Sequence, residues 1–144
     1  MIPFVHLHVH SQYSILDGQA SVKSLVDKAM ANGMRGVALT DHGDMFGIKE
    51  LHDYVNKKNG DHDGNIKKLK KQIDEEKAKE APDQAAIAEL EKQVESETAA
   101  KFKPIFGCEV YVANKTMQEH TDKRDIGRHL ILLAKNSTGY HNLI

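Results

Sequence analysis

Apolar and polar side chains alternate at the start of the chain, in the run Phe4-Val-His-Leu-His-Val-His. A period of two is typical of a β-strand, so this pattern predicts a strand over residues 4–9. Successive side chains of a strand point to opposite faces, and His6, His8 and His10 are therefore expected on one face. Imidazole is a common metal ligand, so the pattern indicates part of a metal site. A half-buried strand with an ordinary polar face is the alternative.

Helical and strand-like patterns alternate through the following residues. Ser21 is a typical N-cap, and the helix that it begins carries apolar residues three and four positions apart before Gly33 ends it. Residues 36–40 form a short apolar strand, and a second amphipathic helix follows, with Gly60 near its end. The apolar stripes of the two helices comprise Val22, Leu25, Val26, Ala29 and Met30, and Ile48, Leu51 and Val55. This order of elements predicts an α/β fold with parallel strand pairing and right-handed crossovers.

The composition changes between about residues 61 and 103, where Lys, Glu, Gln and Ala dominate. Large apolar residues recur there at the spacing of a coiled coil, on both sides of a break at Ala81-Pro82-Asp83. The two sets are Ile66, Leu69 and Ile73, and Ile87, Leu90 and Val94. Because Pro82 can open a helix but cannot continue one, the pattern predicts a helical hairpin, an antiparallel coiled coil. A disordered charged linker is the alternative that this polar composition allows.

Strand patterns resume at Lys103, and a fourth strand begins at Arg128 after a polar loop over residues 115–128. Asn136 is placed to cap a further helix, and the sequence ends within the pattern of that helix. Four strands with their helices are about half of an eight-stranded barrel, which needs roughly 250 residues. We therefore expect part of a barrel-like fold.

Composition narrows the class of protein. A chain of 144 residues, 40% of them hydrophobic, is long enough for one domain with a modest core. It has no apolar run near the roughly 20 residues that cross a membrane and no secretion signal at its start, so a cytoplasmic protein without a membrane partner is expected. The single cysteine, Cys108, fits a reducing compartment, and the net charge of −1 lacks the basic footprint of a stand-alone DNA-binding protein.

Further potential ligands follow the predicted strands, where parallel α/β folds place their sites. Asp17 lies in the loop after the first strand, Asp41 and His42 follow the second, Glu109 lies on the third and His129 begins the fourth. Imidazoles mixed with carboxylates suit Zn²⁺, Mn²⁺ or Fe²⁺ rather than Ca²⁺. Two or more such ions held together suit phosphoester hydrolysis.

Several of these residues have structural alternatives. Asp17 precedes a glycine and could serve a turn, and Asp41 could cap the next helix or orient His42. Glu109 is less easily explained in this way, because a carboxylate buried in an apolar strand needs a partner. On a parallel strand His129 would lie at the end opposite to the site, so its position alone favours a structural role.

Four motifs account for nearly all of the chain outside residues 61–103 and the polar loop. They are Phe4-Val-His-Leu-His-Val-His-Ser-Gln-Tyr-Ser-Ile-Leu-Asp-Gly, Ala38-Leu-Thr-Asp-His-Gly with the later Phe46-Gly, Lys103-Pro-Ile-Phe-Gly-Cys-Glu, and His129-Leu-Ile-Leu-Leu-Ala-Lys-Asn-Ser-Thr-Gly-Tyr-His-Asn-Leu. Together they resemble the polymerase and histidinol phosphatase (PHP) family. Within that family the chain is most similar to the N-terminal domain of bacterial DNA polymerase III alpha subunits.

The resemblance implies a distorted seven-stranded β/α barrel, similar to a TIM barrel, with a cluster of three metal ions at the strand ends. Residues 1–144 would form part of such a PHP domain, with the hairpin of residues 61–103 inserted in it. The family's metal ligands correspond to His8, His10, Asp17, His42, Glu109 and His129. His6 thereby becomes a neighbour of the ligands, and His129 gains a role. The expected catalytic carboxylates are Asp17, Glu109 and Asp41.

The implied function is that of the PHP domain of a replicative DNA polymerase. This would be a Zn²⁺- or Mn²⁺-dependent phosphoesterase with 3′–5′ exonuclease activity, beside a Mg²⁺-dependent DNA-directed DNA polymerase in the parent protein. The implied partners are the DNA primer-template, the remainder of the alpha subunit and a proofreading subunit. The alternatives are a non-catalytic scaffold that docks the proofreading subunit and a stand-alone phosphatase, such as histidinol phosphatase. The family's further Asp-x-His ligand pair has no counterpart in this sequence, so we expect the chain alone to be inactive.

Overall fold

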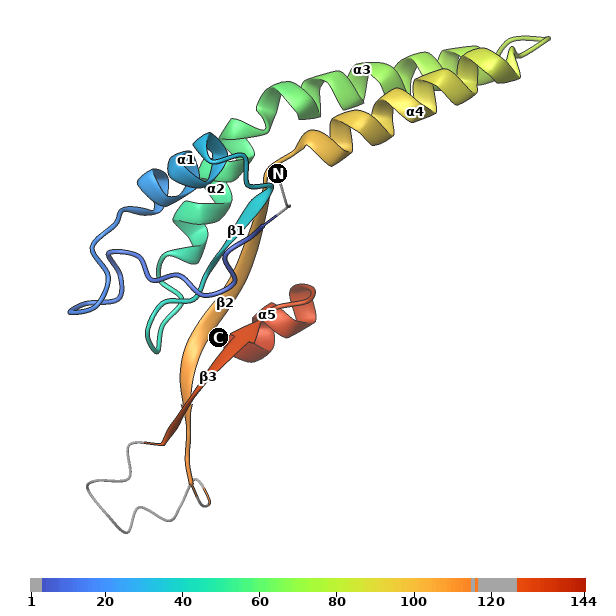
Figure 1. Cartoon of the computed structure of the whole chain (residues 1–144). Helices are drawn as coiled ribbons and strands as arrows, with labels where there is room; N and C mark the ends of the chain where they lie inside the picture. The colour runs from blue at the N-terminus through green and yellow to red at the C-terminus, as the bar shows by residue number, and fades with distance from the viewer. Residues whose placement is uncertain (1–3, 115, 117–126) are drawn as a thin grey trace. The chain divides into compact units, whose positions relative to one another are not determined.

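Five α-helices and one three-stranded sheet form the described part of the chain, residues 4–114, 116 and 127–144 of a computed structural model (Figure 1). In chain order the elements are α1 (Val22–Ala31), β1 (Gly36–Leu39), α2 (Ile48–Lys58), α3 (Gly60–Lys77), α4 (Gln84–Ala100), β2 (Lys103–Val112), β3 (Arg128–Leu133) and α5 (Ser137–Leu143). They divide into two units: the residues up to Tyr54 with Lys103–Ile144, here the sheet unit, and Val55–Phe102, here the hairpin unit. The architecture is mixed α/β, as the sequence predicts.

Strand β2 is the centre of the sheet and has a different kind of neighbour on each side. β1 pairs with it in parallel, and β3 pairs with it antiparallel, with Tyr111 opposite His129. The parallel pairing that the sequence led us to expect is therefore wrong for β3. A parallel neighbour needs a long crossover, usually a helix, whereas the sequence between β2 and β3 carries no amphipathic helical pattern. The polar loop predicted there, over residues 115–128, lies largely outside the described residues.

The N-terminal segment runs beside β1 without being a regular strand, so the predicted strand over residues 4–9 is wrong. Backbone hydrogen bonds of 2.9 Å join Ala38 N to His6 O and Thr40 N to Val9 O. Between these two bonds the first segment advances by three residues and β1 by only two. A bend in the first segment absorbs the extra residue and interrupts the alternation of side chains.

This bend separates the three histidines. The His6 ring lies edge-on to the ring of Phe4, with centroids 4.8 Å apart, and His6 lines a hollow with Leu25 and Ala29 of α1. His8 and His10 point instead toward β2. The expectation that all three histidines share one face is therefore wrong for His6.

The core of the sheet unit contains β1 and the apolar faces of α1 and α2. α1 begins where the sequence predicts, because the Ser21 side chain accepts a hydrogen bond from Ser24 N, and Gly33 follows its end with a φ of +71°. Each fully buried aliphatic side chain stabilises the fold by about 1.5–3 kcal/mol. The buried apolar residues of this unit are Val22, Val26, Ala29, Val37, Ala38, Leu39, Ile48, Leu51 and Cys108.

The hairpin unit is built from α3 and α4, so the residues that could have formed a charged linker are helical. Asp83 caps α4 by accepting hydrogen bonds from two backbone amides. Ile73 and Ile87 are buried at the seam. Gly60, expected near the end of α2, is instead the first residue of α3.

Ion pairs show that the two helices of the hairpin unit are antiparallel. Lys77 Nζ lies 3.1 Å from Glu91 Oε1 near the turn, and Lys101 Nζ lies 2.7 Å from Asp63 Oδ1 at the other end. None of the described helices combines the length and the apolar character needed to cross a membrane.

Candidate metal centre

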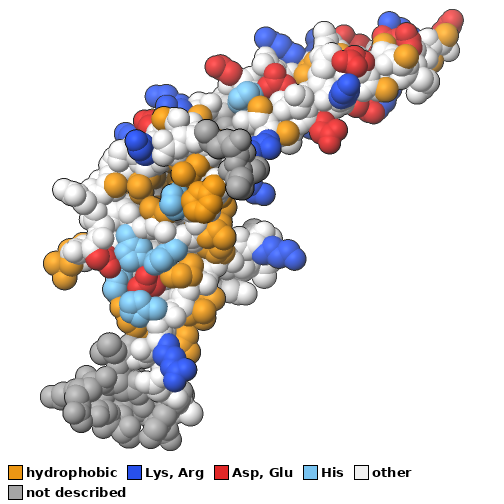
Figure 2. All heavy atoms as spheres, viewed as in Figure 1, with side chains coloured by type: hydrophobic (Ala, Val, Ile, Leu, Met, Phe, Trp, Pro, Cys, Tyr) orange, Lys and Arg blue, Asp and Glu red, His pale blue; other side chains and the backbone are white. Residues whose placement is uncertain are grey.

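The candidate site lies where β1 ends and β2 continues past it. There Glu109 N donates to Asp41 O at 3.1 Å, and Gly43 N donates to Glu109 O at 2.8 Å. His42 and Glu109 are consequently neighbours in parallel register. The N-terminal segment, held beside β1, brings His8 and His10 to the same end of the sheet. Figure 2 shows histidine side chains gathered around acidic side chains on this face.

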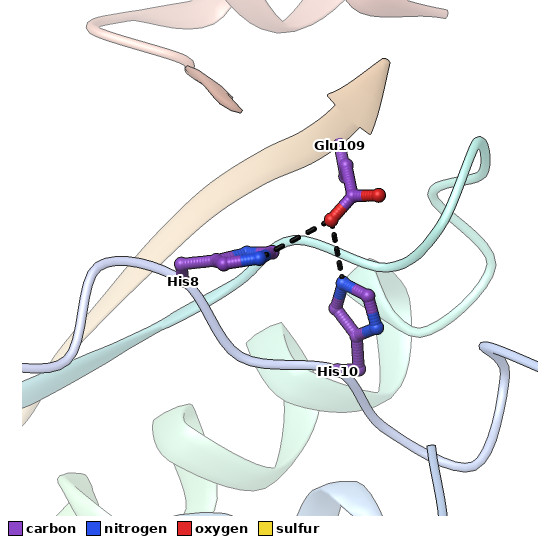
Figure 3. Close-up of side chains that lie close together, drawn as sticks. All are labelled: His8, His10 and Glu109. Carbon is purple, nitrogen blue, oxygen red and sulfur yellow. Dashed lines mark hydrogen bonds and ion pairs between the residues drawn. The ribbon is translucent and has the colours of Figure 1, made fainter. Parts of the chain in front are cut away.

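The first group of possible ligands comprises His8, His10 and Glu109, whose side chains point toward one another (Figure 3). Glu109 Oε2 lies 3.2 Å from His8 Nε2 and 3.0 Å from His10 Nε2. The Glu109 side chain is only 3% exposed, so its carboxylate is almost fully removed from water. A buried carboxylate requires hydrogen bonds or positive charge, which protonated imidazoles or a metal ion can supply.

Thr40 fixes the orientation of His8. The fully buried Thr40 hydroxyl donates to Val9 O at 3.3 Å, and its oxygen lies 2.9 Å from His8 Nδ1. Thr40 therefore holds Nδ1 of His8, and Nε2 faces the Glu109 carboxylate. Either a proton or a metal ion between Nε2 and the carboxylate would stabilise this close approach. This arrangement is the one in which an imidazole binds a metal through Nε2 while its other nitrogen is held by a hydrogen bond.

The second group of possible ligands comprises His10, Asp17 and His42, so His10 belongs to both groups. His10 Nδ1 lies 3.2 Å from Asp17 Oδ1, and His42 Nδ1 lies 2.9 Å from Asp17 Oδ2. In each group the ligand atoms lie within 4.8 Å of one another. The two groups share one ring, and more than one ion could therefore be held side by side.

The hydrogen bond between His42 and Asp17 is the main cause of two pKa shifts. It holds the pKa of the Asp17 carboxyl below its ordinary value of 3.8, and a hydrogen bond with His10 adds to the effect. It raises the pKa of the His42 imidazole above its ordinary value of 6.5, and the negative charges of Asp17 and Glu109 add to that shift. Partial desolvation opposes both shifts. In the absence of a metal ion the pair is therefore held together by a proton, which a metal ion must displace.

Glu109 Oε1 provides the test of whether a metal fits. This buried oxygen has no hydrogen-bond partner in the part of the chain that the structure describes. His129 Nδ1 lies 3.3 Å from it and His42 Nδ1 lies 3.7 Å from it, but neither has hydrogen-bond geometry. An unsatisfied buried carboxylate oxygen costs free energy, and imidazole nitrogens around it are the ligands that Zn²⁺ and Mn²⁺ accept. The donor set fits a divalent transition-metal ion.

His129 joins this group because β3 is antiparallel. In a parallel strand its position at the start of β3 would have placed it at the end of the sheet away from the site. The antiparallel pairing of β3 with β2 overturns that argument.

Tyr111, opposite His129 on β2, is a neighbour that the sequence analysis missed. Its hydroxyl lies 2.8 Å from His42 Nε2, and its ring centroid lies 4.4 Å from that of His129. The spacing of two residues from Glu109 on one strand is the signal that could have found it.

Asp41, expected among the catalytic carboxylates, does not reach the cluster. Its buried side chain accepts hydrogen bonds from Ser11 N at 2.6 Å, Ser11 Oγ at 2.9 Å and Ser14 Oγ at 2.8 Å. Ser14 Oγ in turn accepts from His42 N at 3.0 Å. Asp41 therefore anchors the loop that carries Asp17, and it acts on His42 through the backbone instead of orienting its ring.

Comparison with known sequences agrees with this geometry. The profile of the PHP domain matches residues 6–144, which is almost the whole chain. The chain belongs to the PHP domain family. PHP domains are generally metal-dependent, and the histidine and glutamate side chains described above form a cluster that could bind a metal.

Relatives of this PHP domain occur within much longer proteins. The chain is 39% identical over 147 residues to the DNA polymerase III subunit alpha of Treponema pallidum and 34% identical over 143 residues to that of Borreliella burgdorferi. A third relative, the DNA polymerase III subunit alpha of Helicobacter pylori, is 31% identical over 143 residues. The first two matches cover 98% of this chain but only 9% of the relatives. The chain thus spans about a tenth of the length of these relatives.

Proposed function

We propose that this chain is the metal-dependent phosphoesterase module of a bacterial DNA polymerase III alpha subunit and removes mispaired nucleotides from primer 3′ ends. The observation that carries the proposal is the convergence of His8, His10, His42 and His129 on the buried Glu109 carboxylate. The relatives named as DNA polymerase III subunit alpha support the assignment to that protein.

The described side chains would share the metal ions between them. His8, His10 and Glu109 would hold one ion, Asp17 and His42 would hold a neighbouring one, and His129 would add a ligand beside Glu109 Oε1. Imidazole with carboxylate favours Zn²⁺ or Mn²⁺ at this site, whereas the polymerase of the whole protein would use Mg²⁺. When bound, such ions supply Lewis acidity toward a phosphate ester and its leaving oxygen.

The protein side chains have separate tasks around these ligands. Thr40 would hold Nδ1 of His8 and thereby orient its ring, and Tyr111 would hold the nitrogen of His42 that faces away from Asp17. Asp41, through Ser14, holds the backbone at His42 and the loop of Asp17. Such outer contacts orient metal ligands and are needed for tight binding.

The whole fold and the partners follow from the same assignment to a DNA polymerase III alpha subunit. The sheet would be part of a distorted seven-stranded β/α barrel, into which the helical hairpin of residues 61–103 is inserted. The partners would be the DNA primer-template, the remainder of the alpha subunit and a proofreading subunit. The alternative is a scaffold without catalysis that stabilises the polymerase or docks that subunit.

The decisive experiment compares the full-length protein with its His8→Ala/His10→Ala double variant. The measurements are bound metal per protein by elemental analysis and Zn²⁺- or Mn²⁺-dependent removal of a mispaired 3′ nucleotide. We expect the double variant to lose both, because each group of ligands loses at least one member. His141→Ala, an exposed histidine on α5, is the matched control and should retain both. Cleavage that persists in the double variant, or is absent from the wild type, would contradict the proposal.

A further inference from the structure

A hollow of about 490 Å³ opens beside Asp17 and His42 in the sheet unit. One wall is the loop of Tyr13, Ile15 and Leu16, and the other is the loop that carries Phe46. Small-molecule sites typically measure about 300–1,000 Å³, so the hollow has the size of a ligand site. Two of its lining residues also belong to the candidate metal centre.

The walls of the hollow expose large apolar side chains. Ile15 is 83% exposed, Leu16 is fully exposed and Phe46 is 75% exposed. Scattered single apolar residues are normal on a surface, but three around one hollow next to a polar cluster indicate a binding surface.

Backbone strain marks the same place. Leu16 has a φ of +90°, a conformation that residues with a side chain rarely adopt, and it is the one such non-glycine residue among those that the structure describes. Strain of this kind costs on the order of 1–3 kcal/mol and persists where the surrounding structure enforces it. Two backbone hydrogen bonds hold the loop in this conformation. Ser14 N donates to Ser11 O before Leu16, and Gly18 N donates to Ser14 O across it.

Both walls are anchored. The hydrogen bonds of Ser11 and Ser14 to the buried Asp41 fix the first loop. In the second loop Phe46 N donates to Asp44 Oδ1 at 3.0 Å. Gly47 follows, and a side chain there would collide with Leu39 and with the Asp41 carboxylate, so the backbone after Phe46 is packed directly on the core. The exposed Phe46 ring is therefore held on a fixed base beside the metal ligands.

We propose that this hollow binds an unpaired nucleobase, which stacks on the Phe46 ring while the phosphodiester attached to it lies at the metal centre. The inference rests on the proposed function and names the substrate class of that site: the 3′-terminal nucleotide of a single strand. A ligand that spans the hollow and the metal centre would join an apolar group to an anion, and a nucleotide does so with a flat base that can stack on the Phe46 ring. A base that has left its duplex partner can turn out of the stack and enter the hollow, whereas a paired base is held in the duplex, so this subsite would select frayed or mispaired ends.

Stacking on Phe46 is expected to be tolerant of base identity. Every base has a π-face, and stacking of one base on an aromatic side chain contributes about 1–3 kcal/mol. Gln12 and Asp44 are polar side chains that also line the hollow, and they could contact the edge of a base. The apolar Ile15 and Leu16 would cover the opposite face.

The test measures binding with two short single-stranded probes in the full-length protein. One probe ends in a 3′ 2-aminopurine nucleotide and the other ends in a 3′ abasic nucleotide, and both carry a phosphorothioate at the last linkage to slow cleavage. The wild type should bind the base-bearing probe about 5- to 140-fold more tightly than the abasic probe. Phe46→Ala should remove this difference and the quenching of 2-aminopurine fluorescence, and it should leave the affinity for the abasic probe unchanged.

Two further variants keep the test specific. Phe46→Trp retains an aromatic face and should retain base-dependent binding, whereas Met30→Ala, an exposed apolar residue on α1, should behave as the wild type. Equal effects of Phe46→Ala on both probes, or no effect on either, would overturn the inference.

Cleavage and base-dependent binding, measured on the same proteins, distinguish failure of the nucleobase subsite from failure of the proposed phosphoesterase function. Metal-dependent cleavage of an abasic end without a phosphorothioate, combined with no preference for a base, would leave the phosphoesterase standing and remove the nucleobase subsite. Base-dependent binding through Phe46 without any metal-dependent cleavage would retain the subsite and remove the phosphoesterase.

Discussion

Two histidine–carboxylate pairs in this chain have similar geometry and different surroundings. In the hairpin unit His62 Nδ1 lies 2.6 Å from Glu97 Oε2, and in the sheet unit His42 Nδ1 lies 2.9 Å from Asp17 Oδ2. Glu97 also accepts a hydrogen bond from the side-chain amide of Asn65 at 3.1 Å. Within the described residues, His62 and Glu97 belong to no group of three potential metal ligands, whereas Asp17 and His42 belong to one.

The difference lies in what supports each pair. The hairpin pair bridges two neighbouring helices and is half-buried, but no fully buried carboxylate lies beside it among the described residues of that unit. The pair in the sheet unit is fixed by a buried network of Asp41, Ser11 and Ser14 and lies beside the buried Glu109. A histidine next to a carboxylate is therefore no indication of a metal site by itself. Convergence of separate backbone segments on one buried carboxylate is the distinguishing feature.

The largest expected effect is a loss of stability in the hairpin unit that leaves metal binding in the sheet unit unchanged. Ile87→Ala removes a buried side chain from the hairpin unit, in which Ile87 is 5% exposed, and should destabilise that unit by about 2–5 kcal/mol. Because every candidate ligand lies in the sheet unit, the dissociation constant for Zn²⁺ or Mn²⁺ should not change. Amide hydrogen exchange, resolved by segment, measures the first quantity, and titration calorimetry measures the second.

Leu51→Ala is the matched substitution in the sheet unit, where Leu51 is 1% exposed. It should cost a similar free energy, but it should also weaken metal binding, since it loosens the core beneath the site. If Ile87→Ala weakened metal binding as much as Leu51→Ala does, the two regions would be coupled and the contrast drawn here would fail.

An intermediate effect is expected from the buried serine network. Ser14→Ala removes one of the three hydrogen bonds that the buried Asp41 side chain accepts, and it leaves His42 N without the acceptor that Ser14 Oγ supplies. The expected loss of stability is about 1–3 kcal/mol, together with weaker metal binding. Thermal unfolding with and without added Mn²⁺ measures both. Ser137→Ala, exposed at the start of α5, should change neither, and an unaltered Ser14→Ala protein would show that the network does not support the site.

Local sequence signals predicted the helices well. Ser21 and Gly33 delimit α1, and the two sets of apolar residues around Pro82 lie on α3 and α4, because capping and coiled-coil spacing are properties of neighbouring residues. The N-terminal segment was predicted less well. Its alternation is a strand pattern, but the bend that directs His6 away from His8 and His10 depends on pairing with β1, which local periodicity does not encode.

The candidate site needed knowledge of strand direction as well as residue type. His129 looked misplaced only because its strand was taken to be parallel, and the antiparallel pairing that places it next to Tyr111 is a tertiary feature. Resemblance to the PHP family supplied His129 where geometric reasoning rejected it. Asp41 was the opposite case: its sequence position suggested catalysis, but its two oxygens are taken up by serines that only the folded chain brings to it.

The smallest expected effect concerns the pH dependence of the hairpin pair. Hydrogen bonds from His62 first, and then from Asn65, hold the pKa of the Glu97 carboxyl below its ordinary value of 4.5. A carboxyl whose pKa is lower in the folded state contributes stability above its unfolded pKa, and this contribution is lost as the pH falls through the folded pKa. Glu97→Gln should therefore destabilise the hairpin unit slightly at neutral pH and have a diminishing effect as the pH falls below 4.5.

Thermal unfolding of the wild type and Glu97→Gln across this pH range, with and without Mn²⁺, measures the effect. The difference between the two proteins should be the same with and without the metal, because among the described residues this pair belongs to no group of three potential metal ligands. Glu89→Gln, an exposed glutamate elsewhere on α4, controls for the general loss of a negative charge from that helix. If Mn²⁺ changed the difference produced by Glu97→Gln, the hairpin pair would itself bind the metal, and convergence on a buried carboxylate would no longer separate the two regions.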